Sequence, residues 1–155
     1  MRLAEGLALR GDVTKRVTQL RARIVANARH QEGEQPAEDA VALLAELDLA
    51  LDELESLIRR VNRTNSRAAL GSGTVTDALA RRDVLRIRHG AITAAADAAS
   101  GRDEHGYGRQ LRSELAFVAA VPVAQLRTTA DQVAREIREV DLAVQRVNWE
   151  VDLLD

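Results

Sequence analysis

Apolar residues recur along the chain at alternating spacings of three and four, the period of one helix face. The spacing holds over long stretches, which predicts an all-α fold whose helices pack along coiled-coil-like seams. Polar and glycine-rich breaks separate these stretches. We expect a single helical domain over residues 1–155, an elongated coiled-coil-like bundle of about four helices with an antiparallel N-terminal hairpin. The expected helices span residues 2–28, 36–65, 76–99 and 122–154.

The apolar seam is most regular in the last expected helix, where it runs without a slip. In the second helix Leu43 and Leu57 widen the seam on one side, which indicates more than one packing partner. In the first helix Gly6, Arg10 and Asn27 interrupt it. The seam positions are Leu3, Val13, Val17, Leu20 and Ile24 in the first helix; Leu44, Leu47, Leu51, Leu54, Ile58 and Val61 in the second; Ala80, Val84, Ile87, Ala91, Ala94 and Ala98 in the third; and Val123, Leu126, Ala130, Val133, Ile137, Val140, Val144, Val147, Val151 and Leu154 in the fourth.

The composition excludes several classes of site. The chain has no Cys, so disulfides, thiolate metal sites and cysteine nucleophiles are absent. Aromatic residues make up only 2% of the chain, which leaves little to build a stacking pocket for a base, a flavin or a sugar. Residues 1–16 lack the apolar core of a signal peptide, and no apolar run approaches the ~20 residues of a membrane span. We expect a cytoplasmic protein of bacterial type that does not engage a membrane.

Charge is distributed in blocks of alternating sign. Residues 1–29 hold seven basic and two acidic groups, whereas residues 30–58 hold nine acidic groups and no Lys or Arg. Since a short turn that ends near Pro36 joins the first two helices, we expect them to pair antiparallel with opposite charges across the seam. The flanking residues are Arg2, Arg16, Arg21 and Arg23 on the first helix, and Asp48 and Glu55 on the second.

A basic block in the middle of the chain has two interpretations. Eight arginines on one accessible face would suit nucleic acid. Alternatively, they pair with the acidic second or fourth helix, which we favour because the net charge is −2 and aromatic residues are not interleaved. The block consists of Arg59, Arg60, Arg63, Arg67, Arg81, Arg82, Arg86 and Arg88.

The glycine-rich turn before the third helix is a candidate anion site. Gly71 and Gly73 permit a backbone nest, Thr76 begins the helix, and Arg81 or Arg82 adds positive charge, so phosphate or carboxylate could bind. The turn lacks the spacing and the Lys of a nucleotide-hydrolysing P-loop. The alternative interpretation is a plain capped turn.

No set of residues defines a metal centre or an acid/base pair. The histidines stand apart, with no pair at helical metal-ligand spacing, and only two solvated loop clusters could chelate a cation. We therefore assign no catalytic residue, no metal and no cofactor. The histidines are His30, His89 and His105, and the nearby loop carboxylates are Glu32, Glu34, Asp103 and Glu104.

Several runs carry a resemblance to a known family. They are NARHQEGE at 27–34, VNRTN at 61–65, TDALARRD at 76–83, and the closing Val140-Asp-Leu with Gln145, Asn148 and Trp149. Over nearly its whole length the chain resembles the septicolysin-like family of small bacterial proteins. The resemblance implies a helical fold without an established reaction, and the family's label implies a pore-forming haemolysin.

The same resemblance draws attention to a group of polar residues near the middle of the chain. They form either a buried hydrogen-bond network that fixes helix register or the lining of a small-ligand site. The residues are Asn62, Asn65, Asp77, Arg81, Arg82 and Asp83.

An apolar patch is expected outside the seam of the last helix. Leu142 and Trp149 fall at the heptad position opposite the seam, and Leu153 lies four residues beyond Trp149 on the same side. Such a patch is normally covered. We expect a second subunit to cover it, the alternative being another helix of the same chain.

These observations together predict a non-enzymatic, self-assembling helical interaction or scaffold protein. Three alternatives stay open: a small-anion or small-ligand binding protein or enzyme, a septicolysin-like pore, and a nucleic-acid binding protein that uses the central arginines. The residues of the ligand or enzyme alternative are Asn62, Asp77, Arg81 and Asp83.

Overall fold

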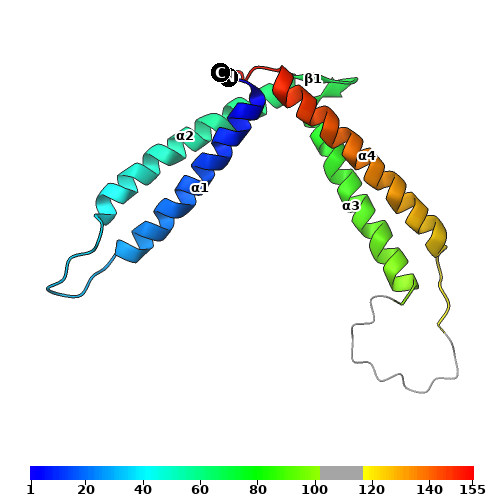
Figure 1. Cartoon of the computed structure of the whole chain (residues 1–155), viewed down its shortest axis with the longest axis horizontal. Helices are drawn as coiled ribbons and strands as arrows, with labels where there is room; N and C mark the ends of the chain where they lie inside the picture. The colour runs from blue at the N-terminus through cyan, green and yellow to red at the C-terminus, as the bar shows by residue number, and fades with distance from the viewer. Residues whose placement is uncertain (102–116) are drawn as a thin grey trace. The chain divides into compact units, whose positions relative to one another are not determined.

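The computed structural model describes residues 1–101 and 117–155, and most of this part of the chain is helical (Figure 1). It contains four α-helices and one two-stranded hairpin, which confirms the predicted all-α fold class. The chain divides into two compact units, residues 1–76 with 145–155 and residues 77–144. The elements are α1 (Leu3–Asn27), α2 (Ala40–Arg67), β1 (Ala69–Leu70), β2 (Gly73–Thr74), α3 (Val75–Ala99) and α4 (Val123–Glu150).

In the first unit α1 and α2 form the antiparallel hairpin that the sequence predicts (Figure 1). Leu20, Leu43 and Ala50 form a buried cluster between them. A second cluster joins Leu3 and Val61 with Leu153 from the end of the chain. Burying a large aliphatic side chain stabilises the fold by about 1.5–3 kcal/mol, so these clusters hold the hairpin together.

The start of α2 corrects the predicted boundary. The helix begins at Ala40 rather than at Pro36, because Asp39 is its N-cap. The Asp39 carboxylate accepts hydrogen bonds from the backbone N–H groups of Val41 at 2.9 Å and Ala42 at 3.3 Å. A side-chain cap satisfies two helix-end donors, which proline at the first turn does not.

Three of the six predicted α2 seam positions are confirmed, since Val61 is buried and Leu47 and Leu54 are half-buried, whereas the other row of the seam is displaced by one residue. Leu43, Ala50 and Leu57 are buried, whereas the expected seam residues Leu44 and Leu51 are exposed. Ile58, seven residues after Leu51, is exposed as well. The two rows are neighbours on the helix, so the widened stripe contains both, and α1 covers only one of them.

The fourth helix ends at Glu150, four residues before the predicted end. The residues that follow pair with the start of the chain: Leu3 N–H donates to the Val151 carbonyl at 3.0 Å and Leu153 N–H donates to the Met1 carbonyl at 2.9 Å. Arg2 and Asp152 form the bridge between them. This backbone pairing competes with helix continuation and replaces it.

In the second unit α3 and α4 run antiparallel, side by side (Figure 1). The predicted α4 seam is confirmed, since its positions in α4 from Val123 to Val147 are all buried or half-buried. The predicted α3 seam is wrong: all six positions are exposed, and Leu85 and Ala96 are buried instead. Because α3 is apolar on two sides, the periodicity did not identify the side that α4 covers.

The break before α3 is a small antiparallel hairpin rather than a plain loop. Ala69 pairs with Thr74, and Leu70 pairs with Gly73. Gly71 has φ 62°, in the left-handed region that glycine adopts without a steric penalty. A positive φ at the first of two loop residues is typical of a type II′ turn.

Candidate functional site

The glycine-rich turn that was expected to bind an anion is the loop of the β1–β2 hairpin. The hairpin ladder uses backbone groups of Leu70 and Gly73, and the Val75 N–H donates to the Ala68 carbonyl at 3.0 Å. Part of the backbone expected to cradle an anion is therefore already hydrogen-bonded. The described structure provides no other support for the expected anion site, which stays a prediction.

The two arginines expected beside that turn contact carboxylates of their own unit. Arg81 pairs with Glu136 of α4 at 3.3 Å. Arg82 lies 3.1 Å from Asp83 and 3.5 Å from Asp141 of α4. Each guanidinium thus has a counter-charge, which explains the polar contact between α3 and α4.

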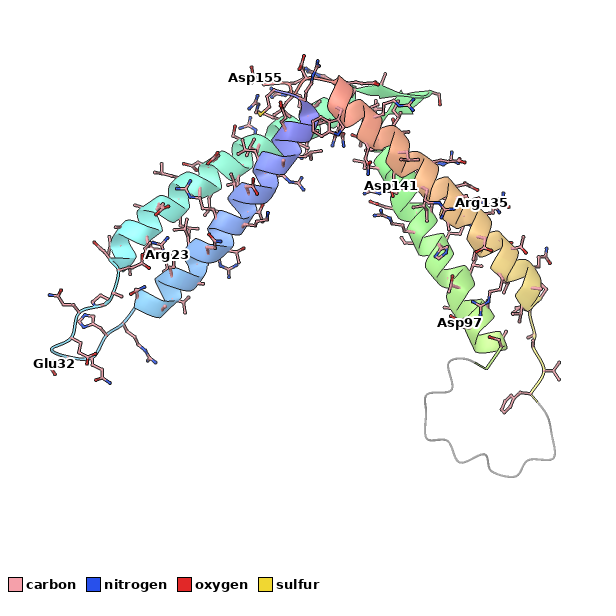
Figure 2. All side chains as sticks on the ribbon, viewed as in Figure 1. Arg23, Glu32, Asp97, Arg135, Asp141 and Asp155 are labelled. Atoms are coloured by element: carbon pink, nitrogen blue, oxygen red, sulfur yellow. The ribbon has the colours of Figure 1, made fainter. Side chains whose placement is uncertain are left out.

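The α3–α4 pair carries two further ion pairs along its length. Arg86 lies 3.3 Å from Asp141, which thereby joins two arginines of α3. At the other end Arg127 of α4 lies 2.6 Å from Asp97 of α3. Figure 2 labels the two carboxylates of these ion pairs, Asp141 on α4 and Asp97 on α3. The Asp141 and Asp97 carboxylates are partly buried. Solvent therefore screens these ion pairs less than it screens fully exposed ion pairs.

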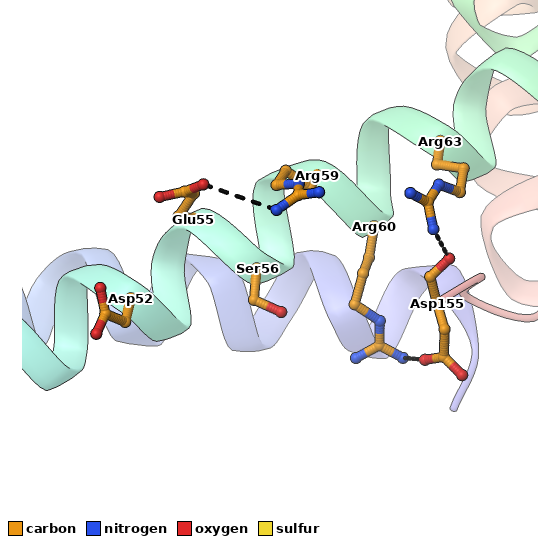
Figure 3. A pocket seen from close by; sticks show the side chains of 7 residues that line it. All are labelled: Asp52, Glu55, Ser56, Arg59, Arg60, Arg63 and Asp155. Atoms are coloured by element: carbon orange, nitrogen blue, oxygen red, sulfur yellow. Dashed lines mark hydrogen bonds and ion pairs between the residues drawn. The ribbon is translucent and has the colours of Figure 1, made fainter.

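Four arginines of the central block, Arg59, Arg60, Arg63 and Arg67, lie on α2, and Arg88 lies on α3. Arg60 contacts the Asp155 carboxylate at 2.8 Å, Arg63 donates to the Asp155 carbonyl, and Arg59 lies 3.9 Å from Glu55 (Figure 3). These contacts border an open groove of about 470 Å³. Arg59 pairs with Glu55 and Arg60 pairs with Asp155, and the lining defines no nucleophile and base pair. The groove is lined by Asp52, Glu55, Ser56, Arg59, Arg60, Arg63 and Asp155.

The polar residues singled out by the family resemblance do not form a buried network. Asn62, Asp77, Arg81 and Asp83 are exposed, whereas Asn65 and Arg82 are half-buried. The expected ligand residues also fall in both compact units. The first unit contains Asn62, Asn65, Gly71, Gly73 and Thr76, and the second contains Asp77, Arg81, Arg82 and Asp83.

Cross-helix ion pairs join α1 to α2, as the charge blocks predict, but with other acidic partners than Asp48 and Glu55. Arg16 lies 2.9 Å from Glu46. Arg23 forms a bidentate contact with Glu38 just before α2, with its Nε donating to Oε2 at 3.0 Å. This hydrogen bond lowers the pKa of Glu38 from its ordinary value.

The candidate cation sites are only partly within the described residues. Asp103, Glu104 and His105 lie outside them. The His30 ring Nδ1 lies 3.0 Å from the Gln31 carbonyl oxygen. In residues 1–101 and 117–155, no three His, Cys, Asp or Glu side chains are grouped in a way that could hold a metal ion. In the same residues, no helix is long and apolar enough to cross a membrane.

Of the three residues in the predicted oligomer patch, two are exposed and one is buried. Leu142 and Trp149 are exposed at 67% and 66%, whereas Leu153 is buried against Leu3 and Val61 of the same chain. The helix ends before Leu153, so this residue does not share a helix face with Trp149. Leu153 is therefore a core residue rather than an interface residue.

The apolar face of α3 that was predicted to be its seam is exposed. Val84 and Ile87 are exposed at 64% and 73%, and four alanines continue their row. The row lies on the opposite side of the helix from Leu85 and Ala96, which are buried. The exposed alanines are Ala80, Ala91, Ala94 and Ala98.

Two structural residues were missed by the sequence reasoning. Thr64 is 2% exposed; its hydroxyl accepts from the Leu154 N–H at 3.0 Å and donates to the Arg60 carbonyl at 2.8 Å. A Cβ at Gly6 would lie 2.8 Å from a methyl of Leu153. Thr64 stands seven residues after Leu57, on the buried row of α2, and this spacing was the signal available.

Paired antiparallel helices with a largely exposed apolar face define the class: a small helical protein without a recognisable catalytic set in its described residues. The chain belongs to DUF6847, a family of unknown function whose pattern matches residues 10–153. It is similar to the crystal structure of a functionally unknown conserved protein from Corynebacterium diphtheriae, with 36% identity, 99% of each chain covered and a TM-score of 0.91. No curated protein matches the chain.

Proposed function

We propose that this is a non-enzymatic, self-assembling helical interaction protein of the cytoplasm, which acts by binding. The observation that carries the proposal is the apolar face of α3, where Val84 and Ile87 are mostly exposed in a single chain. An apolar row at heptad spacing is what one helix presents to another. The side of α3 that α4 covers is a different one.

Two further apolar surfaces support the proposal. On α2, Leu44, Leu51 and Ile58 are exposed beside the seam with α1. On α4, Trp149 is exposed, and tryptophan is among the residues that contribute most to protein interfaces. Scattered exposed apolar residues are normal on a soluble protein, so the regular spacing carries more weight here than the number.

Sedimentation velocity tests the proposal on the full chain, between about 1 and 100 µM, since self-association depends on protomer concentration. A shift to larger species at higher concentration supports it. A monomer throughout this range would overturn it.

Native mass spectrometry of freshly purified protein is the second arm of the test. It reports subunit number together with any small molecule or nucleic acid that copurifies. A monomer that retains a stoichiometric small ligand would replace the proposal with the ligand-binding alternative, and a monomer carrying nucleic acid would replace it with the nucleic-acid alternative.

A further inference from the structure

We propose that α3 of one copy packs in parallel against α3 of a second copy, through the face that carries Val84 and Ile87. This inference rests on the proposed function and names its surface, its partner and its direction. The occupant of this face is a second copy of this chain, because the charges beside the apolar row complement those of an identical helix.

The row follows a heptad without interruption. Its spacings alternate between four and three residues, so Val84 and Ala91 occupy a positions and Ile87 and Ala94 occupy d positions. α3 has 25 residues, a length of roughly 38 Å at 1.5 Å per residue. The row therefore spans most of the helix, and α4 leaves it uncovered because it packs on Leu85 and Ala96.

The charges beside the row decide the direction of pairing. One flank, at the e positions, carries Arg81 and Arg88, and the other, at the g positions, carries Asp83 and Asp97. Arg81 and Asp97 also pair with side chains of α4, so Arg88 and Asp83 are the flank charges that α4 leaves open. In an antiparallel pair each flank meets its own copy, which places arginine near arginine and aspartate near aspartate. In a parallel pair the g flank of one helix meets the e flank of the other, so opposite charges meet.

The register of that pairing is given by Asp83 and Arg88. A g residue in a parallel pair meets the e residue five positions later on the other helix, and Arg88 stands five positions after Asp83. A two-fold axis then produces the contact twice, Asp83 with Arg88 of the second copy and the reverse. This self-complementarity favours a second copy over an unrelated partner.

The Asp83 carboxylate and the Arg88 guanidinium are both accessible for a contact with a second copy. The Asp83 side chain is 62% exposed, and its ion pair is with the adjacent Arg82. Arg88 is exposed and has no ion pair within the described part of the chain. The other arginines of α3 differ, since Arg81, Arg82 and Arg86 pair with carboxylates of α4.

Charge reversal tests the register. Asp83→Arg and Arg88→Asp should each weaken self-association about tenfold, because each brings like charges together at two symmetric contacts. The double variant should recover the parent's association. A mixture of the two single variants should form mixed dimers in preference to either homodimer. Association that is equal in all variants would overturn the inference.

Cysteine cross-linking tests the direction, since the natural chain has no cysteine. Val84→Cys and Ala94→Cys stand ten residues apart on the row. A parallel pair brings each of these cysteines beside its own copy, so both single variants should form disulfide-linked dimers under mild oxidation. An antiparallel pair can do so at one of the two positions at most.

The outcomes separate this inference from the function on which it rests. A parent that sediments as a monomer overturns both. A parent that self-associates while neither cysteine variant cross-links, or only one does, overturns the parallel α3 pairing and leaves self-assembly standing. As a control, Thr93→Cys lies off the row, on the same helix, and should not cross-link.

Discussion

The two helix pairs of this protein use their apolar residues differently. In the α1–α2 pair, large side chains such as Leu20, Leu43 and Leu57 are buried at the contact. In the α3–α4 pair, α3 contributes Leu85 and Ala96 to the buried side while Val84 and Ile87 lie outside. A helix with one apolar stripe identifies its packing side, whereas a helix with two stripes requires knowledge of its partner.

The largest expected effect contrasts the two sides of α3. Leu85→Ala should lower the free energy of unfolding by about 2–4 kcal/mol, because it removes a buried side chain and leaves a cavity. Ile87→Ala, at an exposed position, should lower it by no more than about 0.5 kcal/mol when the chain is monomeric. Denaturation by urea, followed by circular dichroism at low protein concentration, measures both. Equal losses would show that the two sides had been assigned wrongly.

The contact between α2 and the end of the chain should give an intermediate effect. Thr64→Val removes a hydroxyl that accepts from the Leu154 N–H, and it leaves that group without its partner. We expect a loss of about 1–3 kcal/mol in the free energy of unfolding. Thr64→Ser keeps the hydroxyl and serves as the control. If the valine variant were as stable as the serine variant, the hydrogen bond would contribute nothing measurable.

A smaller effect is expected from the two glycines of α1. Gly11→Ala should raise the free energy of unfolding by about 0.5–1 kcal/mol, because a Cβ at Gly11 meets nothing within 4 Å and alanine favours the helix. At Gly6 the same change brings the new methyl against Leu153, so the gain should be absent or reversed. Thermal melts of both variants make the comparison, and an equal rise in Tm would contradict the close approach.

The smallest effect concerns pH and the α1–α2 pair. The hydrogen bond from Arg23 lowers the pKa of the Glu38 carboxyl from 4.5, so the pair favours the folded state above pH 4.5. That contribution is lost as the pH falls through the lowered pKa. Melting temperatures measured from pH 7 to pH 3 should therefore fall more steeply for the parent than for Glu38→Gln. The loop variant Glu34→Gln should follow the parent, and a Glu38→Gln curve parallel to the parent's would contradict the pairing.

The helices and the first hairpin could be predicted because their signals are local. A repeat of three and four residues, a turn and opposite charge blocks are all visible in a short window of sequence. The α4 seam was predictable for the same reason, since α4 has one strong apolar stripe. The α3 seam was not, because its alanines and valine form a regular row on the side that α4 leaves open.

The parts that could not be predicted depend on residues distant in the sequence. A methyl of Leu153 fills the space beside Gly6 that a side chain would otherwise take. The Leu154 N–H donates to the Thr64 hydroxyl, about 90 residues away in the sequence. Nothing in either neighbourhood signals the contact. The candidate surface was visible as a row of apolar positions, but the sequence alone assigned that row to the interior.

The order of contacts along the chain has a consequence for folding on the ribosome. Residues 77–144 form a compact unit from one continuous segment, so they can fold as soon as they emerge. The first unit lacks Leu153 and the strand-like pairing to Met1 until residues 151–153 are made. Its clusters around Leu20 and around Leu3 therefore mature at different times. Protease protection of nascent chains should appear in α1 near Leu20 before it appears near Leu3.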